Sequence, residues 1–213
     1  MKCCFIIICC LFTVGLSAVI ENQTNNPNSL QRSVFDILKE IPKEKITEIA
    51  KDHLQNDDGF KSAIKYMKSA EWRKLIETIK VTTKWVNLKG YITSFGVPID
   101  RLIKCAESFV QNVTITDVPE NTPRNLTSFL RDVEKVIRPA DILIKITQLQ
   151  KNPQIAQLMQ QLKSPETKAK FDEALHIPEI RTVLDELKKM GLSLLYDLIS
   201  VMYYFFGWGQ FKL

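Results

Sequence analysis

The sequence predicts an all-α protein of about twelve short amphipathic helices, arranged in two tandem repeats that form a shell around an apolar cavity. Apolar residues recur at helical spacing along nearly the whole chain, and no stretch alternates cleanly enough to indicate a strand. Residues that start or stop helices come about every 12–16 positions. The 213 residues include only seven glycines and nine prolines, which argues against β-sandwiches, barrels and collagen-like chains.

Composition excludes two further classes of protein. Apolar residues make up 45% of the chain and charged residues 25%, the usual balance of a folded globular protein. Wholesale disorder and a membrane protein with several spans are therefore excluded. The net charge of +5 is modest and spread along the chain, so it indicates no nucleic-acid partner.

The first eighteen residues are typical of a secretory signal peptide. Lys2 is followed by an apolar run from Cys3 to Leu16 and then by the small residues Ser17 and Ala18. The run is shorter than the ~20 residues of a membrane span. A retained anchor is the alternative, although the polar segment 19–28 brings no basic flank that would stop transfer.

Cleavage after residue 18 changes what the five cysteines mean. Four of them, Cys3, Cys4, Cys9 and Cys10, leave with the signal peptide. Cys105 remains and has no partner within its own chain, so we expect a packed core thiol in preference to a nucleophile.

The predicted helices follow from apolar residues three or four positions apart. Their most regular sets are Phe60, Ala63, Ile64 and Met67; Trp72, Leu75, Ile76 and Ile79; Ile99, Leu102, Ile103 and Ala106; Ile142, Leu143, Ile146 and Leu149; Ile155, Leu158, Met159 and Leu162; and Ile180, Val183, Leu184 and Leu187. Asp57 and Ser164 are expected to cap helix N-termini. Breaks are expected at Pro42, Asn56–Gly59, Ser69, Gly96, Pro139, Asn152–Pro153, Ser164–Pro165, Pro178 and Gly191.

These breaks occur twice along the chain. Pro42 and Pro139 are 97 residues apart, whereas Ser69 and Ser164, like Gly96 and Gly191, are 95 apart. The spacing predicts an internal duplication. We expect a first repeat at 29–113, a linker at 114–124 and a second repeat at 125–213, both repeats forming one domain.

Several short segments of the first repeat carry a resemblance to a known family. Asn56–Asp57, Phe60, the run from Tyr66 to Trp72, Gly96–Val97 and Leu102–Ile103 together resemble the insect allergen-related repeat. That family includes the major cockroach midgut allergen, midgut microvillar proteins and nitrile-specifier proteins of caterpillars. The resemblance covers nearly the whole chain after the signal peptide, and its specificity lies in the order and spacing of loose apolar motifs.

The second repeat departs from this pattern at two places. Asn152–Pro153 stands where the first repeat has Asn56–Asp57, and Thr167 stands where it has Trp72. Equivalent roles for the two repeats are therefore not implied.

Most of the predicted helices have one apolar face and a polar opposite face. A solid globule of this many helices should bury some helices that are apolar on every side. The pattern therefore favours a curved layer of helices with water outside and an apolar interior. Twelve helices of twelve residues would enclose roughly 2,000 Å³, more than the roughly 300–1,000 Å³ of ordinary ligand pockets. A conventional packed core is the alternative. The resemblance implies a cavity that holds fatty acids or phospholipid chains. Candidate lining residues are Phe60, Ile64, Met67, Trp72, Ile103, Phe129, Leu158, Met159, Leu184 and Leu198.

Secretion would make three glycosylation sequons meaningful. They begin at Asn22, Asn112 and Asn125, and the last two flank the polar linker. Glycosylation at the last two sites would place the linker on the surface. The alternative is that these sequons occur by chance.

The aromatic C-terminal segment from Met202 to Trp208 has two interpretations. It could close the second repeat by packing, or it could contact lipid headgroups, where Tyr and Trp side chains suit a half-wet setting.

Motifs of catalysis are missing from the sequence. There is no metal-binding pair of histidines or cysteines, no Gly-x-Ser-x-Gly elbow and no phosphate-binding glycine loop. We expect the two histidines, His53 and His176, to lie on helix surfaces or at helix ends. The predicted protein is not an enzyme and needs no cofactor or metal.

The leading hypothesis is a secreted insect midgut protein, in the gut lumen or at the microvillar surface, that binds fatty acyl chains in its cavity. Its partners would be fatty acids or phospholipid, with membrane contact through the C-terminal segment as a further option. The alternatives are a detoxification protein of the nitrile-specifier type and a membrane-active gut protein.

Overall fold

The computed structural model describes residues 42–95, 99–137, 152–192 and 194–211, together with Ile144 and Gln148. These residues form ten helices and no strand, so the all-α prediction is confirmed. The helices are α3 (Lys43–Asn56), α4 (Asp58–Met67), α5 (Ala70–Val81), α6 (Thr83–Ser94), α7 (Ile99–Asn112), α8 (Thr127–Val136), α10 (Pro153–Leu162), α11 (Pro165–Leu175), α12 (Pro178–Lys189) and α13 (Leu194–Phe205). The predicted signal peptide 1–18, the polar segment 19–28, Gly96 and Pro139 lie outside the described residues.

Four helices of the first half recur in the second half at a constant interval. Helices α4, α5, α6 and α7 correspond in this way to α10, α11, α12 and α13. Each pair of helices begins 95 residues apart, at Asp58 and Pro153, Ala70 and Pro165, Thr83 and Pro178, and Ile99 and Leu194. The interval is the one that the repeated serines indicate in the sequence.

The helix caps show why these starts recur. Ser69 Oγ accepts a hydrogen bond from the Trp72 N–H at 3.1 Å, and Ser164 Oγ accepts one from the Thr167 N–H at 3.2 Å. A side chain at this position satisfies a backbone donor that the helix itself leaves unpaired. Asp57, the other predicted cap, accepts from the Phe60 N–H at 2.9 Å.

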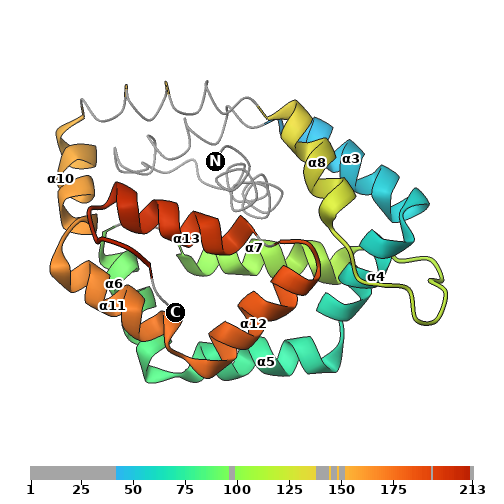
Figure 1. Ribbon diagram of the computed structural model, residues 1–213, viewed down its shortest axis with the longest axis horizontal. Helices are drawn as coiled ribbons and strands as arrows, with labels where there is room; N and C mark the ends of the chain where they lie inside the picture. The colour runs from blue at the N-terminus through green and yellow to red at the C-terminus, as the bar shows by residue number, and fades with distance from the viewer. Residues whose placement is uncertain are drawn as a thin grey trace, which may run out of the picture.

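Helices of the two halves pack on each other in a crossed order. Helix α5 packs on α12, and α6 packs on α11. Because α11 is the counterpart of α5 and α12 that of α6, the pairing is reciprocal, as in an approximate two-fold relationship. Helix α3 packs on α8 and adds a third contact between the halves. In Figure 1, α7 and α13 cross the middle of the view, α3, α4 and α8 lie at one end, and α10 and α11 lie at the other.

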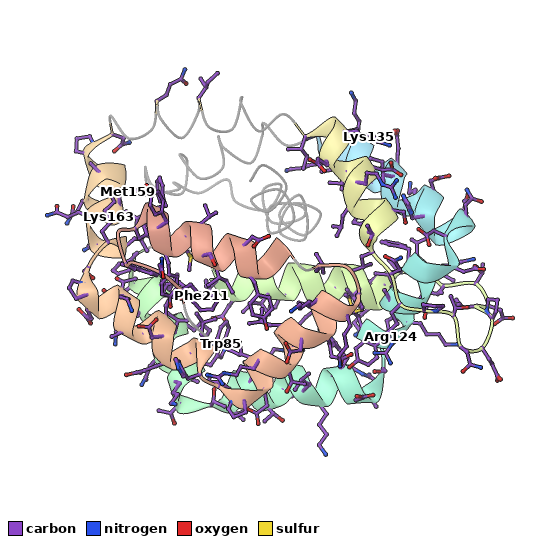
Figure 2. The ribbon with its side chains drawn as sticks, viewed as in Figure 1. Trp85, Arg124, Lys135, Met159, Lys163 and Phe211 are labelled. Carbon is purple, nitrogen blue, oxygen red and sulfur yellow. The ribbon has the colours of Figure 1, made fainter. Side chains whose placement is uncertain are left out.

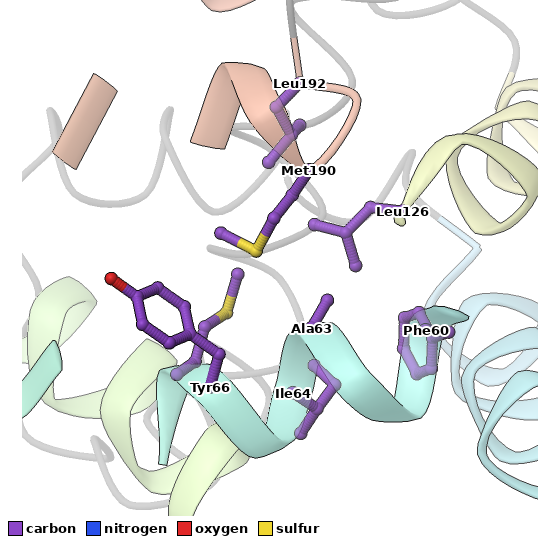
Figure 3. Close-up of a cluster of buried hydrophobic side chains, with 8 residues drawn as sticks. Phe60, Ala63, Ile64, Tyr66, Leu126, Met190 and Leu192 are labelled. Carbon is purple, nitrogen blue, oxygen red and sulfur yellow. The ribbon is translucent and has the colours of Figure 1, made fainter. Parts of the chain in front are cut away.

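One group of buried side chains, which we call the α4 cluster, joins both halves. Its buried members are Phe60, Ala63, Ile64, Tyr66, Met67, Leu126, Met190 and Leu192. Figure 3 shows Leu126 and Met190 reaching toward the side chains of α4. The segment before α8 and the turn after α12 therefore share one apolar core with α4.

A second group, the α6–α11 cluster, lies between those two helices. Its buried members are Leu88, Ile92, Ala174 and Ile177. At its edge Thr167 is fully buried, and its Oγ1 lies 2.9 Å from the Tyr91 hydroxyl. A polar contact thus accompanies the apolar one where the halves meet.

Arg124, labelled in Figure 2, links the segment before α8 to α4 and α12. Its guanidinium carbon lies 3.5 Å from the centre of the Tyr66 ring on α4, and Nη1 lies 3.0 Å from Glu186 Oε2 on α12. Stacking on an aromatic face and pairing with a carboxylate are the two contacts that arginine makes best.

No helix among the described residues is both long and apolar enough to cross a membrane.

Candidate functional site

Five of the predicted lining residues belong to the α4 cluster or pack against it. Phe60, Ile64 and Met67 are buried in the α4 cluster, where their neighbours are other protein side chains. Trp72 and Phe129 are half-buried and pack against that cluster. The Phe60 and Phe129 rings have centroids 4.7 Å apart. The structure therefore brings five of the predicted residues together, in a packed cluster.

The other predicted lining residues lie on separate helices. Leu184 is buried on α12, whereas Ile103 on α7 and Leu158 and Met159 on α10 are only half-buried. The side chain of Leu198 on α13 lies outside the described part of the structure. The cavity itself stays a prediction.

His53 lies in the last turn of α3, at a helix end as the sequence predicts, but its side chain is buried, which the sequence does not predict. It is only 7% exposed and packs against the rings of Phe60 and Phe129, with centroid distances of 5.6 and 5.7 Å. Its Nδ1 lies 2.9 Å from Asp57 Oδ2, and its Nε2 lies 3.1 Å from Asp132 Oδ2 on α8. Each imidazole nitrogen thus faces a carboxylate, so His53 links Asp57 to Asp132 on α8.

The contacts with His53 also affect the pKa values of Asp57 and Asp132. Burial alone would raise the pKa of Asp57, but hydrogen bonds from Ser128, the Phe60 N–H and His53 hold it below its usual value. Hydrogen bonds from Lys135 and His53 likewise lower the pKa of Asp132. Both side chains are therefore ionised at neutral pH.

This arrangement does not form a catalytic triad. The Ser128 hydroxyl donates to Asp57 and not to His53, and both imidazole nitrogens face carboxylates. A base that activates a serine must receive its proton directly. The group acts instead as a polar joint between α3 and α8. Among the described residues, no group of three or more His, Cys, Asp or Glu side chains is placed to hold a metal.

The sequence indicated one of the two carboxylate contacts of His53 in part. Asp57 lies four residues on, at the spacing of neighbours along a helix, and it was recognisable as a cap. Asp132, 79 residues away, had no such signal. His176 is exposed at the C-terminal end of α11, as the sequence predicts.

The end of the chain is buried on one side and exposed on the other. Tyr203 and Trp208 are buried, with ring centroids 5.2 Å apart. Val201, Tyr204 and Phe205 follow one face of α13 and are exposed, Tyr204 by 85%. Both interpretations of the C-terminal segment therefore have residues to support them.

Burial raises the pKa of Tyr203 well above its usual range, and the hydrogen bond to the charged Asp172 carboxylate raises it further. Tyr203 thus stays a neutral donor.

Two of the three sequon asparagines lie among the described residues. Asn112 ends α7 and Asn125 precedes α8, and both are exposed. Asn125 Oδ1 accepts a hydrogen bond from the Thr127 N–H at 2.8 Å. Asn22 lies outside the described residues, and glycosylation of all three stays a prediction.

Comparison with known proteins identifies the family. Residues 29–196 match the model of the insect allergen related repeat, which is described with nitrile-specifier detoxification. No curated protein and no solved structure matches the chain. Because the match spans far more than half of the sequence and agrees with the duplicated helices, the chain belongs to the insect allergen related repeat family.

Proposed function

We propose that this protein binds the acyl chains of lipids between its two helical repeats. The proposed setting is extracellular, in the gut lumen or at the microvillar surface, as the family resemblance and the predicted signal peptide suggest. In this role the protein needs no catalytic residue, cofactor or metal, and its partners are lipids and not nucleic acid.

The observation that carries the proposal is the incomplete burial of apolar side chains on α7 and α10. Ile103, Leu158 and Met159 keep exposed surface although they lie on the apolar stripes of their helices. Among the described helices, α10 packs mainly on α11, and α7 mainly on α6. Apolar surface that other helices leave uncovered is the surface that a hydrocarbon chain would bury.

The energetics favour such a ligand. Moving one CH₂ group from water into an apolar site gains about 0.8 kcal/mol. A chain of many such groups offsets the loss of its own freedom without a specific polar contact. This argument explains why a site for acyl chains can lack the precise motifs that enzymes show.

Titration with a fluorescent fatty acid tests the proposal. A charge at Met159 would have to be buried against the chain, so Met159→Asp should weaken binding at least about tenfold. Lys163, exposed in the turn that follows α10, supplies the matched control, and Lys163→Glu should bind like the wild type. Met159 and Lys163 lie near the same end of α10 (Figure 2). Equal binding by all three proteins would contradict a site on α10.

The description of the family favours a second candidate function, detoxification of the nitrile-specifier type. Such a protein would redirect the breakdown of plant glucosinolates. Incubation of the purified protein with a glucosinolate breakdown mixture tests this, since a lipid carrier should leave the product ratios unchanged. A dose-dependent rise in nitriles would favour detoxification over lipid binding.

A further inference from the structure

Trp208 carries a buried hydrogen-bond donor that has no partner. The side chain is 8% exposed, and its Nε1 is the one buried side-chain nitrogen or oxygen without a hydrogen bond in the part of the chain that the structure describes. Buried polar atoms are nearly always paired, because leaving one unpaired forfeits its contact with water. An unpaired indole N–H is therefore a place where an acceptor is missing.

The backbone holds the indole in this position. Gly207 adopts a φ of 71°, and the Trp208 N–H donates to the Tyr203 carbonyl at 2.8 Å. This turn ends α13 and folds the chain back, as left-handed glycines commonly do at helix C-termini. The Trp208 ring then packs against Phe171 of α11, with centroids 5.4 Å apart. The side chain is thus fixed from two sides.

The described neighbours of the indole are aromatic rings. Besides Phe171, these neighbours are Tyr203 and Phe206, whose ring centroids lie 5.2 and 5.0 Å from that of Trp208. Such rings offer only weak N–H···π contacts. The Tyr203 hydroxyl already donates to Asp172, and Lys168, which approaches the Tyr203 ring, is paired with Asp172 at 2.5 Å.

A path of apolar side chains connects this donor with the surface. Phe205 is exposed on α13 and contacts the half-buried Phe206, with centroids 5.4 Å apart. Phe206 in turn contacts Trp208. A row of three aromatic rings therefore leads from the exposed face of α13 to the indole of Trp208.

We propose that Trp208 Nε1 donates a hydrogen bond to the carbonyl oxygen of an acyl ester, whose hydrocarbon part lies against the half-buried Phe171 and Phe206. The inference rests on the proposed binding of acyl chains and adds where the polar end of the ligand is held. An ester is favoured over a free carboxylate because Lys168 is already neutralised by Asp172. A neutral donor among neutral rings suits a neutral acceptor.

Binding of three probes of equal chain length tests the proposal: methyl laurate, laurate and dodecane. Trp208→Phe keeps an aromatic ring and removes the N–H, so methyl laurate should bind about three- to tenfold more weakly. Dodecane has no acceptor and should bind equally well to both proteins. An equal affinity of both proteins for methyl laurate would overturn the inference while leaving acyl binding intact, and a larger effect on laurate would overturn the choice of an ester.

A spectroscopic measurement decides the matter even if the variant folds poorly. The wild type, labelled with ¹⁵N, gives an indole signal for each of its three tryptophans. Methyl laurate should move the Trp208 indole proton downfield, and dodecane should not. Saturating methyl laurate without this shift would contradict the inference, whereas failure of all three probes to bind would contradict the proposed function itself.

Discussion

The backbone N–H of Leu126 donates a hydrogen bond to the carbonyl oxygen of Met190 at 2.7 Å, and both side chains lie in the α4 cluster. The bond joins the start of α8 to the turn between α12 and α13. Gly191, the next residue, has a φ of 94° and lies against Thr127. This tight turn is what lets the second half of the chain close on the first.

Replacement of Gly191 should therefore destabilise the protein. In Gly191→Ala the new Cβ would overlap Thr127 Oγ1, and alanine rarely adopts a positive φ. We expect the free energy of unfolding to fall by about 1–3 kcal/mol in urea denaturation. Gly90 is the matched control, because it lies inside α6 and a Cβ added there would meet no other atom within 4 Å. Gly90→Ala should raise stability by about 0.5–1 kcal/mol, and a similar loss in both variants would contradict this account of the turn.

The polar contact between α6 and α11 yields a second prediction. Thr167 Oγ1 donates to the Gln161 carbonyl at 2.7 Å, so the Tyr91 hydroxyl must be the donor in the contact between Tyr91 and Thr167. Thr167→Val should cost about 0.5–1.5 kcal/mol of stability because it removes the hydrogen bonds that the buried Thr167 hydroxyl makes. Combined with Tyr91→Phe in a double-mutant cycle, it should show coupling of about 0.5–3 kcal/mol. Strictly additive losses would show that the two hydroxyls do not act together.

Stability should also fall in acid. The pKa of Asp57 is held below its ordinary value of 3.8, so its ionised form stabilises the folded state above that pH. The contribution is lost as the pH falls through the lowered, folded-state pKa. Asp57→Asn should lower the free energy of unfolding by about 1–3 kcal/mol at pH 7, because it disturbs the helix cap and the contacts with His53 and Ser128. The variant should also lose less stability than the wild type as the pH falls, so the acid limb of its curve of stability against pH should be flatter.

The control for this prediction is Asp100, an exposed residue that pairs with Lys89 at 3.0 Å. Surface pairs contribute little, so Asp100→Asn should change stability by less than about 1 kcal/mol. Urea titrations at several pH values measure both variants. An unchanged acid limb in Asp57→Asn would contradict the role given to this carboxylate.

The exposed face of α13 leads to a prediction about membranes. Val201, Tyr204 and Phe205 would bury apolar surface on contact with a bilayer, which makes them suitable for interfacial binding. If that contact occurs, the triple change of these residues to Ser should abolish co-sedimentation with phosphatidylcholine vesicles. Val81, another exposed valine, at the end of α5, serves as control, and Val81→Ser should sediment like the wild type. Equal sedimentation of the triple variant would exclude this face as the contact.

The sequence predicted those parts of the fold that depend on local interactions. Helical spacing, the caps Asp57 and Ser164 and the 95-residue interval are all visible within a few residues or by self-comparison, and the helices begin accordingly. The crossed pairing of α5 with α12 and of α6 with α11 depends on contacts between distant segments, for which spacing carries no signal.

The site residues show the same limit. Trp72 is half-buried beside Tyr66, whereas its counterpart Thr167 is fully buried against α6. The difference between the two repeats was visible in the sequence, but its structural meaning was not. The burial of His53 was not predicted for a similar reason, because it depends on α8 and on Asp132.

The most direct test of acyl binding is the ligand content of the protein itself. The protein would be expressed in insect cells, purified without detergent and extracted with organic solvent. The extract would be analysed by mass spectrometry against that of an unrelated protein of similar size from the same cells. If acyl chains bind between the repeats, the extract should contain about one mole of acyl lipid, or more, per mole of protein. This ratio should be lower for Met159→Asp. Lipid at the trace level of the control protein, in a sample shown to be folded by its helical circular dichroism, would contradict it.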